Sequence, residues 1–186
     1  QTVEQALDEA QIRILNESEF SEEHRAFVSN YFKTQIRTHL VPIMIEDHRP
    51  FPDLKDGVLY FVVGMEVERT HGITTEYALI QIPPHLPRFV ILPADQGERN
   101  VAFIDDVIRN DLHRIFRLFQ PEKVYAHTIK VTRDAEIDMD DDLSRSLMEK
   151  MSDGLDQRKH GDFVRLIYDR EMPDDMLRLV KKKLSL

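Results

Sequence analysis

The chain has 186 residues and a formal net charge of −9, from 34 acidic and 25 basic side chains. This length is enough for one domain with a buried core, and the acidic balance argues against a general binder of nucleic acids or anionic membranes, which need a basic surface. There is no cysteine and no apolar run near the roughly 18 residues of a membrane span, so disulfides, thiolate metal sites and membrane spans are not expected.

The first part of the chain is predicted to be helical. A short helical pattern covers residues 3–12, and a longer amphipathic helix follows over residues 22–40, with Ser21 as its N-cap. The apolar positions of the longer helix recur at three- and four-residue spacing and are Phe27, Val28, Tyr31, Phe32, Ile36 and Leu40. Pro42 limits this helix, and the proline-containing residues 48–53 are typical of a linker or an ordered loop.

Sequence typical of strands follows the loop. Residues 58–67 and 74–82 are rich in β-branched and aromatic side chains, which predicts two strands. Gly72 lies between them and fits the positive-φ position of a hairpin connection. Several prolines then interrupt regular structure before residues 88–92, for which we predict a short third strand.

The second half of the chain alternates between helical and extended patterns. We predict a helix over 105–119, a strand over 125–133, a helix over 143–155, a strand over 163–168 and a last helix with Pro173 in its first turn. A strand, a helix and a strand in succession predict a parallel, right-handed crossover. The chain as a whole is therefore predicted to be α+β, with a mixed β-sheet that has helices packed on it and an N-terminal amphipathic helix pair before it.

Familiar phosphate-binding and metal-binding motifs are missing from the sequence. The six glycines form neither a P-loop nor a dinucleotide-binding loop, and no two of the eight histidines have the spacing of a helical ligand pair. His127 lies on the apolar side of its strand and could be a general base, although a partly buried histidine with a hydrogen-bond partner explains the pattern more simply.

The acidic residues from Asp138 to Glu149 imitate the ligand spacing of an EF-hand calcium loop. Leu143, however, stands where such a loop needs glycine, and it begins the apolar stripe of the helix predicted over 143–155. We therefore interpret these acids as cap and first-turn residues of a helix. The lysines at 181–183 likewise suit the negative end of the last helix.

Several segments give the chain a resemblance to a known family. Residues 78–90 (ALIQIPPHLPRFV) and 131–138 (VTRDAEID) resemble the long, histidine-phosphorylating polyphosphate kinases of bacteria. Further matching segments are Ile104–Arg109, Phe163–Leu166 with Met172–Pro173, Tyr31–Phe32 and Leu40–Ile43. They occur in the family's order from about residue 10 to the end, so the resemblance covers nearly the whole chain.

The resemblance implies an enzyme that transfers the terminal phosphate of ATP to polyphosphate through a phosphohistidine, with Mg²⁺. In the family, that histidine lies in a later stretch like His-x-Gly-Thr-Gly-Asn, and the magnesium-binding residues also lie in later domains. The resemblance therefore implies that residues 1–45 are a helical segment ending the N-terminal domain and that residues 46–186 are the α+β head (middle) domain. It implies no catalytic, cofactor-binding or metal-binding residue in this chain, which is expected to be inactive alone.

The resemblance also has implications for partners and location. It implies a scaffolding role with contacts to the parent's own catalytic domains and within a homo-oligomer, and it makes ATP and polyphosphate partners of the parent. A cytoplasmic parent is implied, with membrane association left open, and the lack of cysteine fits a reducing compartment. The sequence starts without Met or signal-peptide features, so we expect a piece of a longer protein.

Arg88 and Arg133 are the candidate residues for an anion contact. Both lie in the segments that carry the resemblance, and a guanidinium group binds phosphate through two parallel hydrogen bonds. Arg133 also ends a predicted strand, where ligands are often bound in open α/β layers. Asp134, Glu136 and Asp138 follow it, however, and a structural ion pair would occupy Arg133 instead.

Two other functions stay open at this point. The first is a free-standing α+β interaction module that uses an exposed sheet face to bind a protein partner. The second is a small hydrolase that relies on His127 and an acid such as Asp134.

Overall fold

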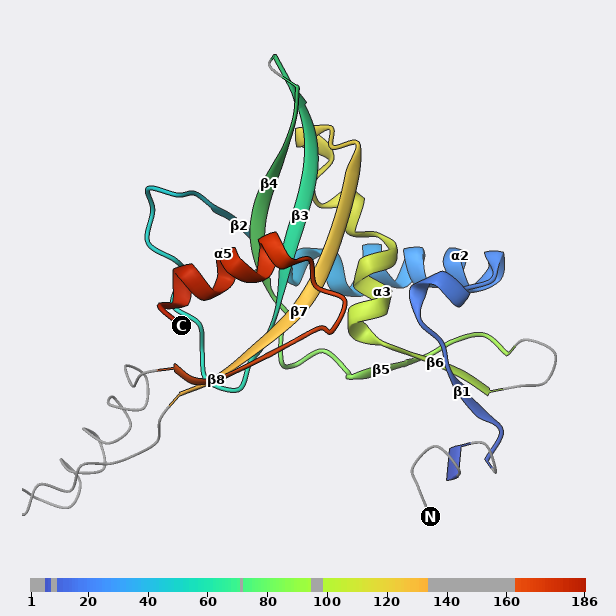
Figure 1. Ribbon diagram of the computed structural model, residues 1–186. Coiled ribbons are helices and arrows are strands. Elements are labelled where there is room, and N and C mark those ends of the chain that lie inside the picture. The colour runs from blue at the N-terminus through green and yellow to red at the C-terminus, as the bar shows by residue number, and fades with distance from the viewer. Residues whose placement is uncertain (1–5, 8–9, 71, 95–98, 134–162) are drawn as a thin grey trace, which may run out of the picture.

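The computed structural model describes residues 6–7, 10–70, 72–94, 99–133 and 163–186. They form a larger and a smaller β-sheet with helices packed against them, which confirms the predicted α+β class (Figure 1). The predicted helix over 143–155, the acidic segment 138–149 and Asp134 lie outside the described residues.

The larger sheet has five strands in the order β2-β4-β3-β7-β8, and every neighbouring pair is antiparallel. Its strands are β2 (Pro42–Ile45), β3 (Leu59–Arg69), β4 (Gly72–Gln81), β7 (Lys123–Arg133) and β8 (Phe163–Tyr168). The hairpin predicted around Gly72 is confirmed, and the φ of this glycine is 116°. The predicted parallel crossover is wrong, because β8 pairs antiparallel with β7 and starts opposite Arg133, where β7 ends.

The smaller sheet has three strands in the order β1-β6-β5. Strand β6 (Arg99–Phe103) pairs in parallel with β1 (Ile12–Ile14) and antiparallel with β5 (Phe89–Ile91), so this sheet is the mixed one. Strand β5 confirms the short strand predicted over 88–92. Of the helix predicted over 3–12, residues 6–7 are helical, but Ile12 already belongs to β1, since isoleucines at 12 and 14 favour extended backbone.

The helix predicted over 22–40 exists with a change of geometry partway along. Helix α2 (Glu22–Tyr31) starts at Ser21, whose side chain accepts a hydrogen bond from the backbone N–H of His24. A π-helical turn (Phe32–Ile36) and a 3-10 turn (Arg37–His39) then complete the element. Its predicted core positions are buried except Phe27, which is 37% exposed, and Tyr31, which is partly buried. The predicted N-terminal helix pair is not confirmed, and residues 1–45 contain two strands.

The helix predicted over 105–119 is shorter than expected. Helix α3 (Ile104–Asn110) ends after seven residues, and two 3-10 turns (Leu112–Arg114 and Arg117–Phe119) replace the rest. The predicted last helix is present as α5 (Asp174–Leu184), with Pro173 as its N-cap rather than within its first turn. Its Lys183 donates hydrogen bonds to the backbone carbonyls of residues 46, 47 and 49, so this lysine fixes a loop.

The two faces of the larger sheet carry separate hydrophobic cores. On one face, Phe61 and Val63 of β3 pack with residues of α2 and α3. On the other face, Tyr60 and Val62 pack with Met176 and the other apolar residues of α5 (Figure 1). Successive side chains of β3 therefore point to opposite faces of the sheet and contact different helices. Helix α3 packs on the same face as Phe61 and Val63.

Gly64 in β3 gives room to the ring of Tyr125 on the neighbouring strand. A Cβ atom at Gly64 would lie 2.4 Å from Cζ of Tyr125, closer than two carbon atoms can pack. We therefore expect Gly64→Ala to lower the free energy of unfolding by about 1–3 kcal/mol through overpacking, measured by urea denaturation. In a double-mutant cycle, Tyr125→Leu should remove most of this cost. Additive effects of the two substitutions would contradict the proposed clash.

Candidate functional site

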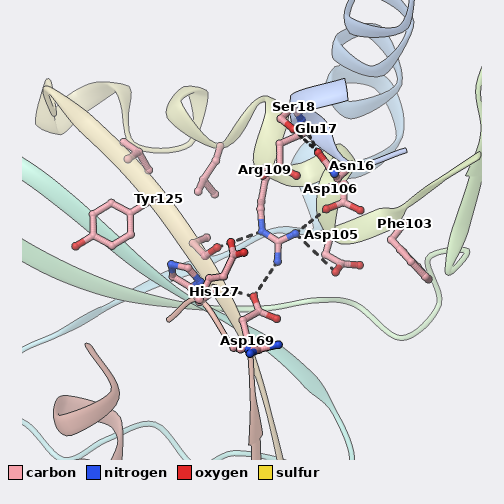
Figure 2. Close-up of a pocket in the computed structure, with 15 residues that line it drawn as sticks. Asn16, Glu17, Ser18, Phe103, Asp105, Asp106, Arg109, Tyr125, His127 and Asp169 are labelled. Carbon is pink, nitrogen blue, oxygen red and sulfur yellow. Dashed lines mark hydrogen bonds and ion pairs between the residues drawn. The ribbon is translucent and has the colours of Figure 1, made fainter. Parts of the chain in front are cut away.

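A pocket of about 910 Å³ opens where α3, β7 and the N-terminal segment meet (Figure 2). Its wall consists of Asn16–Ser18, the first turns of α3, residues 124–127 of β7 and the turn 169–171 after β8. Charged side chains dominate this wall, with five carboxylates, two arginines and one histidine among the lining residues. The pocket is therefore a polar site assembled from four separate parts of the chain.

Arg109 lies at the centre of the site and is held on several sides. Its Nη1 donates a hydrogen bond to Asp106 Oδ1 at 2.7 Å, its Nη2 to Asp169 Oδ2 at 3.0 Å, and its Nε to the carbonyl of Ala126 at 3.1 Å (Figure 2). The guanidinium also lies 5.2 Å from the centre of the Phe61 ring, and the side chain is only 17% exposed. Arg109 thus joins α3 to β7 and to the end of β8.

Asp169 is a second residue of the site that is held by several hydrogen bonds. Its carboxylate accepts hydrogen bonds from the backbone N–H of Thr128, at 2.7 Å, and from the Thr128 hydroxyl, in addition to that from Arg109. The backbone N–H of Asp169 in turn donates to the carbonyl of Thr128 at 3.1 Å. This exchange of hydrogen bonds extends the pairing of β8 with β7 and places the carboxylate beside Arg109.

Asp106 is buried beside two other carboxylates. Burial, a hydrogen bond with Glu17 and the charge of neighbouring Asp105 together raise its pKa to about 7, although Arg109 acts in the opposite direction. Only 7% of Asp106 is exposed. The N-terminal segment, which contributes Glu17, therefore contacts a carboxyl group whose pKa lies well above that of an exposed aspartate.

His127 faces the same pocket, whereas Asp134, the acid of the hydrolase hypothesis, lies outside the described residues. Its Nδ1 lies 3.8 Å from Asp169 Oδ2, yet burial and the charge of Arg109 lower the pKa of His127 against the opposing effect of Asp169. We therefore treat His127 as neutral at pH 7, and the contact as weaker than an ion pair. The hydroxyl of Ser18, which also lines the pocket, donates to Asn16 Oδ1 at 2.6 Å. The hydrolase hypothesis thus has no nucleophile paired with His127 among the residues that the structure describes.

Arg88 and Arg133, the predicted anion contacts, take part in separate networks. Arg133 donates to Asp53 and to the carbonyl of Leu54, and its backbone N–H donates to Asp56; its side chain is 9% exposed. It thereby orders the predicted loop, and Asp53 is its ion-pair partner among the described residues.

Arg88 is more accessible than Arg133. Its Nη1 lies 2.9 Å from Asp105 Oδ1, and its guanidinium stands 5.0 Å from the centre of the Phe103 ring. The side chain is 49% exposed. An anion contact at either arginine stays a prediction, and Arg88 is the more accessible of the two, although an anion there would compete with Asp105.

The charged core of the site was only partly visible in the sequence. Asp105, Asp106 and Arg109 have the spacing of neighbours on one helix face, which is a recognisable signal for ion pairs. Asp169 lies 60 residues from Arg109 in the chain, so no local pattern links the two. In the described ranges, no three histidine or acidic side chains gather in a way that could hold a metal ion. No helix there is long and apolar enough to cross a bilayer.

Comparison with known proteins gives consistent results. Residues 23–186 match a family model described as the polyphosphate kinase middle domain. The chain is 36% identical over 180 residues to a polyphosphate kinase of Vibrio vulnificus, and 35% identical over 181 residues to one of Escherichia coli K12. These matches cover 94% and 95% of this chain but only 25% and 26% of the relatives, so the chain spans about a quarter of their length.

A solved structure shows the same similarity at the level of the fold. The crystal structure of polyphosphate kinase from Porphyromonas gingivalis superposes with a TM-score of 0.71 and 25% sequence identity. The match covers 98% of this chain and 25% of that one.

We expect Arg109→Met to lower the free energy of unfolding by about 3–5 kcal/mol, because it leaves buried carboxylates without their counter-charge. Arg49→Met is the matched control, since both partners of its ion pair with Glu46 are exposed, and we expect it to cost about 1 kcal/mol or less. Chemical denaturation of both variants measures the difference. Equal costs for the two substitutions would show that Arg109 does not hold the site together.

The raised pKa of Asp106 predicts a specific dependence of stability on pH. The stability linked to its proton is fully present below the unfolded pKa, near 3.8, and is lost as the pH rises through about 7. Relative to the wild type, Asp106→Asn should therefore gain on the order of 2 kcal/mol between pH 5 and pH 8, measured by denaturation at each pH.

Asp175→Asn is the control for this measurement. A hydrogen bond from Tyr77 lowers the pKa of Asp175, so its contribution is lost only at more acidic pH. Its stability difference from the wild type should stay constant between pH 5 and pH 8. A flat difference for Asp106→Asn as well would contradict the raised pKa.

Proposed function

The chain belongs to the polyphosphate kinase family, as its middle domain, and from this premise we propose that it is a scaffold of the parent enzyme rather than a site of its chemistry. The observation that carries this proposal is the charge distribution in the pocket. Its buried guanidinium, Arg109, is occupied by two carboxylates and a backbone carbonyl, and further carboxylates line the wall. An anionic substrate such as ATP or polyphosphate would be repelled there.

The parent enzyme, in this proposal, transfers phosphate from ATP to polyphosphate through a phosphohistidine outside this chain, with Mg²⁺ bound outside it as well. The states of two histidines support this division. His24 is buried, and its ring nitrogens lie within hydrogen-bonding distance of the Ser21 N–H and the Pro93 carbonyl. His127 borders a carboxylate that would repel a phosphoryl group. Contacts with the catalytic domains and within an oligomer of the parent are part of the same proposal.

Any polyphosphate contact by this domain would use the predicted arginines. Arg88 is better placed than Arg133, because Arg133 already supports the loop around Asp53. The alternative function, a free-standing interaction module, has one feature in its favour, which is an exposed apolar face on the smaller sheet. That face is equally compatible with a domain of a longer enzyme.

The proposed division of labour predicts that the 186-residue chain neither takes up phosphate from ATP nor elongates polyphosphate. The test is incubation with radiolabelled ATP and Mg²⁺, followed by electrophoresis under alkaline conditions that preserve phosphohistidine. The full-length parent, treated in parallel, should incorporate label and form polymer. Alkali-stable label on the isolated chain would place phosphoryl transfer in this domain and overturn the proposal.

A further inference from the structure

The smaller sheet has an apolar outer face. Cross-strand register places Phe89 opposite Phe103, and places Ile91 and Ile14 on either side of Val101. Ile12 completes the row next to Ile14 along β1. Phe89, Ile91 and Ile14 are 50%, 77% and 38% exposed, and the others are partly buried. We call these six residues, which come from all three strands, the outer apolar face: Ile12, Ile14, Phe89, Ile91, Val101 and Phe103.

The opposite face of the same sheet is already buried along β5 and β6, while Arg13 of β1 is exposed there. Val90 and Ala102, which pair with each other, are 5% and 0% exposed and belong to the core with α2 and α3. A sheet with one face in water normally alternates apolar and polar side chains along each strand. Apolar residues on both faces are instead the pattern of a sheet that is covered on both sides.

The outer apolar face is internally ordered rather than a scatter of single exposed residues. The rings of Phe89 and Phe103 lie 4.9 Å apart between centroids, and Arg88 stacks on Phe103 at one margin. Arg99, which pairs with Ile12 and is exposed, stands at the other margin. A contiguous apolar surface with a polar rim is typical of a protein contact.

The length of the relatives and the position of β1 indicate what covers this face. The chain spans about a quarter of the curated relatives, so most of the parent polypeptide lies outside it. The match to the middle domain starts at residue 23, whereas β1 lies before it, so the face joins the middle domain to the residues that precede it. A surface on the same polypeptide also has a far higher effective concentration than a separate molecule.

We propose that the outer apolar face is an interdomain contact, covered in the parent enzyme by an apolar surface of the same polypeptide from outside these 186 residues. Acidic side chains at the margin of that surface would complement Arg99 and Arg88. The proposal depends on family membership and on the length of the relatives. It does not depend on the scaffold role, so a catalytic middle domain would leave it unchanged.

The first test measures accessibility in the full-length parent. Ile91→Cys is compared with Leu118→Cys, because Leu118 is 96% exposed and lies in a 3-10 turn away from the smaller sheet. Maleimide labelling, quantified on proteolytic peptides, should be more than about tenfold slower at position 91 than at 118 in the folded enzyme, and equal in denaturant. Equal rates in the folded enzyme, at unchanged melting temperature, would overturn the proposal.

The second test identifies the covering segment. A benzophenone photo-crosslinking amino acid replaces Phe89 in the full-length parent, with the same group at Leu118 as control. The expected product runs at the mass of one chain and joins position 89 to a peptide outside these 186 residues. A product with the mass of two chains would identify a second copy, and a link to residues 134–162 would identify a segment of this chain. Either of these products, or no cross-link, would overturn the proposal.

Discussion

Burial of both faces of the larger sheet is the constraint on which the other elements depend. Alternate residues of β3 belong to two different cores, so neither face can be left to solvent. Helix α5 must cover one face, while α2 and α3 must cover the other. The early end of α3 and the change of geometry after α2 are compatible with this arrangement, because burial of their apolar side chains outweighs regular helical hydrogen bonding in the last turns.

The charged site lies at the edge of this packing, between α3, β7 and the turn that follows β8. Helix α3 crosses one face of the sheet and brings Asp105, Asp106 and Arg109 to β7. Paired with Asp106 and Asp169, Arg109 can be buried at an acceptable cost in desolvation. The same pairing directs Nε and both Nη atoms of Arg109 to partners within the protein. A phosphate group would have to share or displace these partners in order to bind this guanidinium.

Local patterns predicted elements better than they predicted their partners. The sequence predicted β3, β4 and β7 from their β-branched residues, and it predicted a last helix near Pro173. Each of these predictions depends only on neighbouring residues. The sequence did not predict that β8 runs antiparallel to β7 or that β1 pairs with β6, since both pairings depend on residues far away in the chain. The site divides in the same way, with Arg109 and Asp106 close in sequence and Asp169 remote.

Parallel pairing of β1 with β6 has a consequence for the order of folding. Strands β3 and β4 are joined by a short turn, so their pairing needs little loop closure. Ile12 instead pairs with Arg99, and more than half of the described residues lie between them. Contacts of such long range form late in folding. During synthesis, β1 leaves the ribosome well before β6 and stays unpaired until β6 has been made, so its isoleucines are exposed to chaperones in that interval.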